Sequence, residues 1–328
     1  MKWLLILALA FLVPAIVIQS NDDFLEHVED LRLTDGNTLH DWFKPTTPRS
    51  GTRAYGKASK YNRYLRSIQK DSFKVKVVGG RPAKAGQIPW QASVKLLHNG
   101  VLTHSCGAVI INKYWLLSAA HCFDDPLQPK RWVTVGELRL GVKDKGQQTF
   151  EVDRIFKHTL YNKMTNDYDA ALIRIKPLRR GRGIQFNKSV KAIRLSSSRT
   201  SVKVGASLLV SGWGWTKPCV DCKPGSQNVS PVLMKADIRL ISPDKCKELY
   251  KTSITDRMFC AGYIERPIDS CSGDSGGPVA FKSGGSYRLY GIVSWGQGCA
   301  QINKPGVYTR VPILVPWILQ IMKQYKPK

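Results

Sequence analysis

The chain of 328 residues is long enough for one domain of about 250 residues with extensions. Lys and Arg total 50 against 24 Asp and Glu, and the formal net charge of +26 favours polyanionic partners such as heparin-like glycans, acidic proteins or nucleic acid. Two basic clusters, at 179–182 and 245–247, are candidate contact points, but no aromatic residues are interleaved with them, which argues against sequence-specific nucleic-acid recognition. The alternative is a soluble basic protein without such a partner.

Residues 1–20 have the pattern of a secretory signal peptide. Lys2 precedes an apolar run over residues 3–18, and Gln19 and Ser20 follow it. A transmembrane anchor is the alternative, but the run is short, is interrupted by Pro14, and has no apolar stretch of spanning length after it. We therefore expect removal of this segment and a secreted, extracellular protein without a stable membrane anchor. The eight cysteines fit an oxidising extracellular setting.

Residues 21–76 contain no cysteine and divide into an acidic and a basic half. Seven acids and one arginine lie in 21–43, whereas ten Lys and Arg and one acid lie in 44–76. Apolar residues at 24, 25, 28 and 31 fit one short amphipathic helix, and the Pro-, Ser- and Arg-rich remainder predicts a largely unstructured linker. Because the first cysteine is Cys106, no disulfide can hold this segment after a cleavage.

From Gln87 onward, short apolar runs alternate with turns, a pattern that predicts β-strands. Such runs occupy 91–97, 108–112, 132–135, 171–175 and 207–211. Helical spacing returns only at 316–325, where apolar residues recur at 318, 321, 322 and 325. The sequence therefore predicts an all-β domain with a C-terminal α-helix.

Ser275 lies in a glycine-rich stretch, Gly273-Asp274-Ser275-Gly276-Gly277. Glycines lack Cβ, so a scissile carbonyl can approach Ser275 Oγ closely and backbone N–H groups can point at a developing oxyanion. The stretch also matches the G-x-S-x-G nucleophile elbow of α/β-hydrolases, which need a histidine after the serine. No histidine follows Ser275, which excludes that order. The order Asp, His, Ser of subtilisins would require His158, and nothing around that residue supports it.

The remaining possibility is that the three catalytic residues follow one another along the chain as His, Asp and Ser. Several motifs support this order. They are SAAHC at 118–122, DAAL at 169–172, GDSGGP at 273–278 and SWG at 294–296, with VVGG upstream at 77–80. Together they resemble the chymotrypsin–trypsin family of serine proteases over about residues 77–328. The resemblance implies two six-stranded antiparallel β-barrels packed together, with an active site in the cleft between them, preceded by the signal peptide and a propeptide.

The resemblance also implies a catalytic triad of His121, Asp169 and Ser275. His121 would accept the proton of Ser275 Oγ and later donate it to the leaving amine, while Asp169 fixes the imidazole tautomer. Asp169 directly precedes the apolar run 170–173, so a chain entering a core strand would bury and orient its carboxylate. Asp167 is the competing acid, and only the family motif decides between them. The N–H groups of Gly273 and Ser275 would form the oxyanion hole.

Asp269, six residues before Ser275, falls where the family has the floor of its primary specificity pocket. A carboxylate there needs a cationic partner, so the resemblance implies cleavage after Lys or Arg. Gly296 and Gly306 fall where glycines leave the pocket walls open for a long side chain. A surface aspartate in a turn is the alternative interpretation. The other substrate-binding positions that the resemblance implies are Ser270, Ser294 and Trp295.

Residues 21–76 would be the propeptide of a zymogen, activated by cleavage after Lys76. The new ammonium of Val77 would pair with Asp274 and thereby order the oxyanion backbone, because either charge alone is expensive to bury. His104 falls where some zymogens of the family hold this aspartate; a satisfied core histidine is the alternative. Cleavage after Lys76 fits a trypsin-like activator, including the enzyme itself.

Spacing alone cannot pair the eight cysteines. The resemblance implies the bridges Cys106–Cys122, Cys246–Cys260 and Cys271–Cys299. Cys219 and Cys222 remain, in a loop bounded by Gly and Pro. We interpret this pair as a local staple, since neither a redox context nor a second zinc-binding pair accompanies it.

We expect no cofactor and no metal. The segment 137–148, where trypsin binds calcium, offers only Glu137 and Asp144 amid lysines. Asn187 is a candidate glycosylation acceptor, and Asn228 is a poorer one because Pro231 follows its motif. Expected partners are protein or peptide substrates and serpin-type or Kunitz-type inhibitors. The alternative function is that of a non-catalytic, polyanion-binding protease homologue; such homologues usually lose a triad residue, and this chain keeps all three.

Overall fold

The computed structural model describes residues 80–98, 100–127, 129–215, 229–251, 254–265, 273–297 and 301–327. The predicted signal peptide and the propeptide with its cleavage site lie outside these ranges. So do Val77, Asp269, Ser270, Asn228 and the cysteines Cys219, Cys222, Cys271 and Cys299.

The first half of the described chain forms a closed antiparallel barrel of six strands in the order β2-β3-β4-β7-β6-β5. The strands are β2 (Gln91–His98), β3 (Val101–Ile110), β4 (Trp115–Ser118), β5 (Arg131–Val135), β6 (Gln148–Lys157) and β7 (Ala171–Ile175). Side chains on successive strand residues point to opposite faces, so one face of each strand fills the barrel. The interior includes Val94, Ile110, Leu116, Phe150 and Ile173, all almost completely buried.

The second half forms another six-stranded ring, because β9 pairs with both β10 and β12 and so closes the path β9-β10-β11-β14-β13-β12. Its strands are β9 (Ser207–Gly212), β10 (Met234–Leu240), β11 (Met258–Gly262), β12 (Pro278–Ser283), β13 (Ser286–Trp295) and β14 (Gly306–Arg310). Two short strands, β1 (Arg81–Pro82) and β8 (Arg194–Leu195), attach to β10 and β13. The prediction of two six-stranded antiparallel barrels is confirmed.

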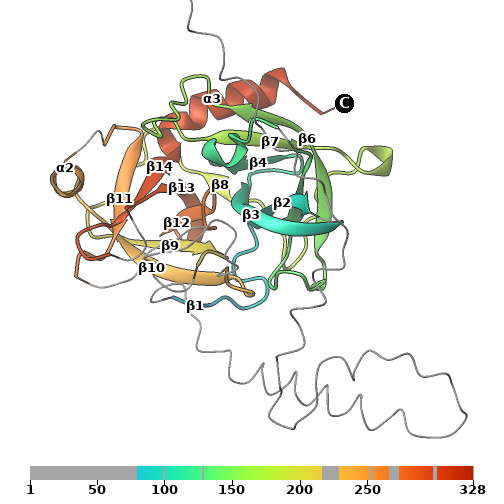
Figure 1. Ribbon diagram of the computed structural model, residues 1–328, viewed down its shortest axis with the longest axis horizontal. Helices are drawn as coiled ribbons and strands as arrows, with labels where there is room; N and C mark the ends of the chain where they lie inside the picture. Colours follow the sequence, from blue (N-terminus) through green and yellow to red (C-terminus); the bar gives the residue numbers. More distant parts are fainter. Residues whose placement is uncertain are drawn as a thin grey trace, which may run out of the picture. The chain divides into compact units, whose positions relative to one another are not determined.

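Two α-helices lie outside the barrels (Figure 1). In α2 (Pro243–Tyr250), Ser242 Oγ accepts the Lys245 N–H and Pro243 occupies the first turn, two features that favour a helix start. The C-terminal helix α3 (Val311–Gln324) begins five residues before the predicted start. Pro312 lies in its first turn, where no N–H donor is required, and therefore does not end the helix. Leu314 and Ile318 are buried in a core shared with Trp115 of β4 and Leu289 of β13.

Candidate active site

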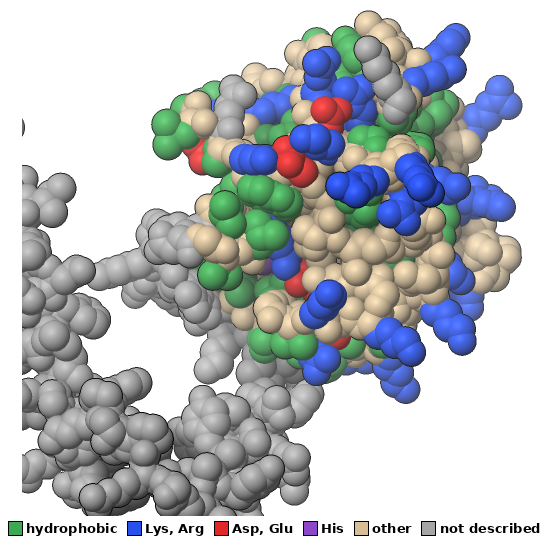
Figure 2. All heavy atoms as spheres, turned by 90° about the vertical axis from the view of Figure 1, so that its right-hand side faces the viewer, with side chains coloured by type: hydrophobic (Ala, Val, Ile, Leu, Met, Phe, Trp, Pro, Cys, Tyr) green, Lys and Arg blue, Asp and Glu red, His purple; other side chains and the backbone are tan. Residues whose placement is uncertain are grey.

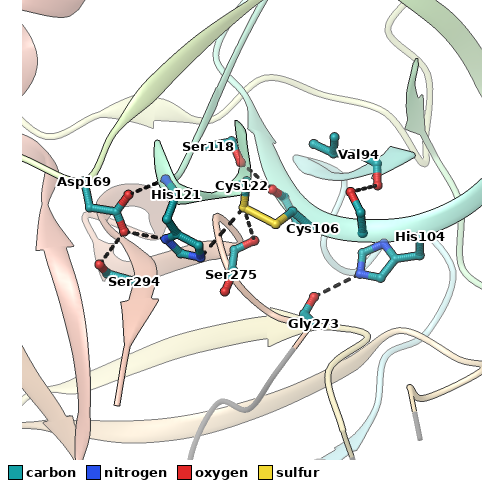
Figure 3. The surroundings of a disulfide bond; sticks show 12 residues. Val94, His104, Cys106, Ser118, His121, Cys122, Asp169, Gly273, Ser275 and Ser294 are labelled. Carbon is teal, nitrogen blue, oxygen red and sulfur yellow. Dashed lines mark hydrogen bonds and ion pairs between the residues drawn. A yellow bond between two sulfur atoms is a disulfide. The ribbon is translucent and has the colours of Figure 1, made fainter. Parts of the chain in front are cut away.

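Two paired strands of the first barrel bring His121 and Asp169 together. β4 ends three residues before His121, which lies in the short 3₁₀ helix η3 (His121–Phe123), and β7 begins two residues after Asp169. Ser118 of β4 is paired with Ala171 of β7, so both functional residues emerge from the same end of the strand pair. His121 Nδ1 lies 2.7 Å from Asp169 Oδ2, and the His121 backbone N–H donates to Asp169 Oδ1 at 3.0 Å (Figure 3).

Asp169 is completely buried and is also held from the second barrel. Ser294 Oγ of β13 donates to Asp169 Oδ2 at 2.5 Å, and Thr309 Oγ1 of β14 donates to the Asp169 backbone carbonyl at 2.9 Å. Both barrels therefore fix the orientation of this carboxylate. The sequence placed Ser294 among the substrate-binding residues; in the structure its hydroxyl binds Asp169, a contact that no local sequence pattern marks.

The environment of His121 favours the imidazolium. Burial would lower its pKa, but the hydrogen bond and the negative charge of Asp169 outweigh that effect and raise the pKa above the ordinary value of 6.5. Because a carboxylate can only accept, the Nδ1 atom carries the proton in the neutral ring, which leaves Nε2 as an acceptor. This assignment is the one a general base requires.

Ser275 lies against the other edge of the His121 ring, next to the disulfide Cys106–Cys122 (Figure 3). Cys122 Sγ lies 4.0 Å from His121 Nε2 and 3.8 Å from the Ser275 carbonyl oxygen, so one sulfur atom contacts both residues. Cys106, Cys122 and His121 also cluster closely enough to suggest metal ligands. The two cysteines are joined to each other, however, and cannot serve as thiolate ligands.

The backbone around Ser275 is fixed at the contact between the two barrels. The Gly107 N–H of β3 donates to the Ser275 carbonyl at 2.7 Å, and the Gly276 N–H donates to the Val293 carbonyl at 2.8 Å. Gly276 has a φ of 77°, and a Cβ there would lie far inside contact distance of Ser118 Oγ and the Gly107 carbonyl. Glycine is required at this position because of both the left-handed backbone and the close approach of the barrels.

His104 supports the same loop from the first barrel. Its Nε2 donates to the Gly273 carbonyl at 2.9 Å, so Nδ1 accepts from Ser93 Oγ at 2.8 Å. Burial lowers the pKa of His104 to about 4, against the raising effect of the Gly273 hydrogen bond and with a small contribution from Lys95, and the ring is therefore neutral near pH 7. In this structure both ring nitrogens are satisfied, as the core-histidine interpretation expected.

Asp274 is buried beside two glycines of β9 and the segment that follows it. Its Oδ1 accepts the Gly214 N–H at 2.7 Å. A Cβ on Gly212 or Gly214 would overlap the Asp274 carboxylate, which explains why glycines flank Trp213 in this chain. No sequence motif predicted that these two glycines make room for Asp274. The expected partner Val77 lies outside the described residues.

Asp167, the competing acid, has a different role. Its carboxylate accepts hydrogen bonds from Arg257 Nη2 at 2.5 Å, Arg257 Nε at 3.1 Å and Thr255 Oγ1 at 2.7 Å. Burial would raise its pKa, but these bonds outweigh that effect and lower it. Arg257 also packs over the Tyr168 ring, 4.9 Å from its centroid. Asp167 therefore joins the segment before Asp169 to the second barrel and does not contact His121.

Comparison with known proteins agrees with this arrangement. A sequence profile of the trypsin family matches residues 77–318. The chain belongs to the trypsin family. It is 40% identical over 248 residues to rat "Transmembrane protease serine 9", covering 75% of this chain and 22% of that protein. It is 38% identical over 251 residues to bovine "Suppressor of tumorigenicity 14 protein homolog", covering 74% of this chain and 28% of that protein. The chain thus spans about a quarter of the length of these relatives.

The name of the rat relative describes a transmembrane protein. Among the residues that the structure describes here, no helix is long and apolar enough to cross a bilayer.

Of the residues predicted to bind substrate, those in the described part of this trypsin-family chain lie in or next to β13 and β14. Trp295, at the end of β13, packs edge-on against Tyr250 of α2 at a centroid distance of 5.1 Å. Gly296 is exposed after it, and Gly306 is buried at the start of β14. The segments 266–272 and 298–300, which contain Asp269 and Cys299, lie outside the described residues.

The two acids in the segment 137–148, where trypsin binds calcium, form ion pairs with basic side chains of this chain. Lys95 Nζ lies 2.6 Å from Glu137 Oε1, and both side chains are buried. Asp144 accepts the backbone N–H groups of Leu138 and Arg139, and its other oxygen binds the Arg139 guanidinium. In this trypsin-family chain, a lysine ammonium is therefore the positive charge beside Glu137.

Removing that ammonium is expected to destabilise the fold. In Lys95→Met, Glu137 would keep its charge in a buried site without a partner, and such losses cost about 3–5 kcal/mol of unfolding free energy. Burial already raises the pKa of Glu137 despite Lys95, so the variant should recover part of its stability as the pH falls and Glu137 is protonated. Urea unfolding at several pH values measures this, with Lys130→Met, at an exposed pair, as control. Equal loss in both variants would contradict the account.

Proposed function

We propose that the protein is a serine endopeptidase in which His121, Asp169 and Ser275 form the catalytic triad. The observation that carries the proposal is the 2.7 Å contact between His121 Nδ1 and Asp169 Oδ2, which leaves Nε2 on the side of Ser275. Family membership supports the reaction class, and the name of the rat relative describes a serine protease. The mechanism is the one established for this family, carried over to these residues.

In the first step, His121 Nε2 takes the proton of Ser275 Oγ while Oγ bonds to the carbonyl carbon of the substrate. The carbonyl oxygen becomes an oxyanion, which the N–H groups of Gly273 and Ser275 would bind; losing one such donor typically costs about 2.7–4 kcal/mol. His121 then gives its proton to the leaving amine as the C–N bond breaks. Water repeats the sequence on the acyl-enzyme and restores Ser275. The hydrogen bond from His104 to the Gly273 carbonyl supports this part of the backbone.

The rate should depend on the protonation state of His121. Because its pKa is raised above 6.5, kcat/KM should be high at alkaline pH and fall as the pH drops through a midpoint above that value. In Asp169→Asn the group that stabilises the imidazolium is lost, so the midpoint should move to lower pH. A profile of kcat/KM from about pH 5 to 9 with a neutral peptide substrate measures both midpoints. An unchanged midpoint in the variant would contradict the assignment of Asp169.

We further propose that Asp269 selects Lys or Arg before the scissile bond. Gly296 and Gly306, together with Ser270 and Trp295, would border the pocket, and a carboxylate at its floor would need a cationic side chain. Asp269→Ser should therefore lose the preference for Lys and Arg over uncharged residues. Competitive cleavage of a peptide mixture measures this ratio directly. A retained preference would assign substrate selection to another acid.

Activation would follow cleavage between Lys76 and Val77. The new ammonium would enter the buried site of Asp274, where Gly212 and Gly214 leave room for the carboxylate. The Gly214 N–H already holds the Asp274 carboxylate, which supports the view that Asp274 would bind the Val77 ammonium in a fixed geometry. The ion pair would link proteolysis to the oxyanion backbone, because Gly273 and Ser275 flank Asp274 in the chain.

We also propose removal of residues 1–20, secretion, glycosylation at Asn187 and inhibition by serpin-type or Kunitz-type proteins. Asn187 is exposed, and its Nδ2, the atom that would carry a glycan, donates to the Gly146 carbonyl at 3.1 Å. A glycosylated Nδ2 keeps one hydrogen and could retain that bond. Mass spectrometry of the secreted protein tests both the new N-terminus and the glycan.

The competing function is that of a non-catalytic protease homologue. It keeps the family fold but cannot form an acyl-enzyme. A fluorophosphonate probe, which bonds covalently to an activated serine, distinguishes the two functions on correctly cleaved protein. Labelling of Ser275, absent in Ser275→Ala, supports the enzyme. Failure to label folded and cleaved protein would favour the homologue.

A further inference from the structure

The connection between the two barrels contains no acidic residue. Residues 170–215 include ten Lys and Arg but neither Asp nor Glu. Two of these cations have a carboxylate partner: Arg174 binds Asp153, and Lys176 lies 3.7 Å from Glu151. The other eight are exposed and, within the described part of the chain, form no ion pair. They are Arg179, Arg180, Arg182, Lys188, Lys191, Arg194, Arg199 and Lys203.

Three of these arginines are displayed on one tight turn, the 3₁₀ helix η4 (Arg179–Gly181) and the residue after it. The Leu178 N–H donates to the Arg182 carbonyl at 2.8 Å and closes the turn. Arg180 has a φ of 61°, a left-handed conformation that non-glycine residues rarely adopt. An arginine at an exposed position that favours glycine or asparagine suggests that its side chain is needed there.

A groove beside the C-terminal helix is linked to this turn through Tyr114. Tyr114 Oη donates to the Gly181 carbonyl at 3.0 Å, and the Ile184 N–H donates to the Lys113 carbonyl at 2.8 Å, so η4 lies against residues 113–114. Lys113 and Lys323 of α3 both line the groove, together with Tyr114, Trp115, Leu319 and Met322. We call the five cations of this surface the basic rim: Arg179, Arg180, Arg182, Lys113 and Lys323. Figure 2 shows the side of the molecule that bears η4, where Lys and Arg side chains far outnumber acids.

The basic rim is separated from the candidate active site by the length of a strand pair. β4 and β7 run antiparallel, with Ser118 opposite Ala171 at one end and Trp115 opposite Arg174 at the other. His121 and Asp169 emerge from the first end, whereas Lys113 and the turn η4 emerge from the second. A ligand on the rim would therefore leave the cleft between the barrels open.

We propose that the basic rim binds a sulfated polysaccharide chain of the heparin type. Sulfate groups match the planar fork of N–H donors on the three arginines, and several cations without a carboxylate partner along one surface fit a linear polyanion. The groove between Lys113 and Lys323 is open to solvent, so an extended chain can lie along it. Of the two aromatic residues at the groove, Trp115 is buried and Tyr114 is half-buried with its hydroxyl bonded to Gly181, so neither provides a stacking platform for single-stranded nucleic acid.

The second basic cluster, at 245–247, provides a matched control. Lys245 binds Glu248 in α2, and Asp244 lies in the same helix, so this surface carries acids among its cations. One variant replaces Arg179, Arg180 and Arg182 by glutamine, and the other replaces Lys245, Lys247 and Lys251 by glutamine. Each removes three positive charges. Both are made in the full chain and in a Ser275→Ala background, so that the binding measurement does not depend on catalysis.

The test is the dissociation constant for a heparin oligosaccharide as a function of NaCl concentration. The arginine variant should bind at least about tenfold more weakly, and the slope of log Kd against log NaCl concentration should fall by roughly one for each arginine–sulfate ion pair removed. The lysine variant should change less than about twofold. With Ser275 present and the chain cleaved after Lys76, all proteins should cleave a short peptide at similar rates, which shows that the folds are intact.

Three outcomes would overturn the proposal. Equal weakening in both variants would show that net charge alone drives binding. Unchanged binding of the arginine variant would remove the rim from the contact. A parent protein that binds phosphatidylserine vesicles or single-stranded DNA through these arginines, and that does not bind heparin better than a desulfated heparin, would assign the rim to another class of ligand.

Discussion

Replacing Ser275 by alanine should lower kcat by about a million-fold, the scale seen when the nucleophile of a serine protease is removed. In the proposed mechanism Oγ is the only atom that can form the acyl-enzyme, and neither His121 nor Asp169 can substitute for it. The fold should persist because backbone hydrogen bonds hold this segment. The Gly107 N–H donates to the Ser275 carbonyl, and the Gly276 N–H donates to the Val293 carbonyl. Single-turnover kinetics with a fluorogenic peptide measure the loss.

The control for Ser275→Ala is thermal unfolding, which should match that of the parent protein. A residual rate that a fluorophosphonate probe abolishes belongs to a contaminating serine protease, because the variant has no Ser275 Oγ for the probe to label. Cleavage at the parental rate by pure, folded variant would remove Ser275 from the mechanism.

Asp169→Asn should lower kcat by about 10⁴, the drop that the equivalent substitution causes in proteases of this family. An amide at this position can donate to His121 Nδ1, which favours the tautomer with its proton on Nε2 and leaves that atom unable to accept from Ser275. The amide should fit the same space, because its oxygen can still accept the His121 backbone N–H and its nitrogen, in the place of Oδ2, can donate its second hydrogen to Ser294 Oγ. Steady-state measurement of kcat, at pH values above the midpoint of the His121 titration, gives the size of this loss.

Ser294→Ala is the matched control, since it removes one hydrogen bond to Asp169 Oδ2 and keeps the carboxylate. One net hydrogen bond is worth about 0.5–1.5 kcal/mol, so this variant should lose at most about tenfold in kcat. If Asp169→Asn lost no more than Ser294→Ala, the carboxylate would act only through packing and the proposed triad would be wrong.

Much of the fold was accessible from the sequence because strand signals are local. The run 171–175 predicted β7 with the observed bounds, since every residue on it is apolar except Arg174. The run 108–112 captured only the end of β3, because the first half of that strand contains three consecutive polar residues, Thr103, His104 and Ser105, and therefore lacks an apolar run. The predicted start of α3 at residue 316 lies five residues late, because apolar spacing alone does not show that Pro312 can occupy a first turn.

In the candidate site, too, local motifs were predictable from the sequence and long-range contacts were not. Chain order and short motifs identified His121, Asp169 and Ser275, and the structure places the first two in contact and the third beside them. Contacts between distant strands were not predictable, because nothing near Ser294 or Thr309 indicates that they bind a residue more than a hundred positions away. Asp167 and Asp169 also look alike in sequence; only Arg257, brought in by the second barrel, separates their roles.

The central claim is that cleavage after Lys76 creates an enzyme that cuts after Lys and Arg through Ser275. The most direct measurement is turnover of a peptide panel that varies only in the residue before the scissile bond, with the chain before and after cleavage at Lys76. Ser275→Ala, cleaved in the same way, is the control. We predict turnover of the Lys and Arg peptides alone, by the cleaved parent alone. If folded and correctly cleaved protein turned over no peptide, or turned over uncharged peptides equally well, the account would be contradicted.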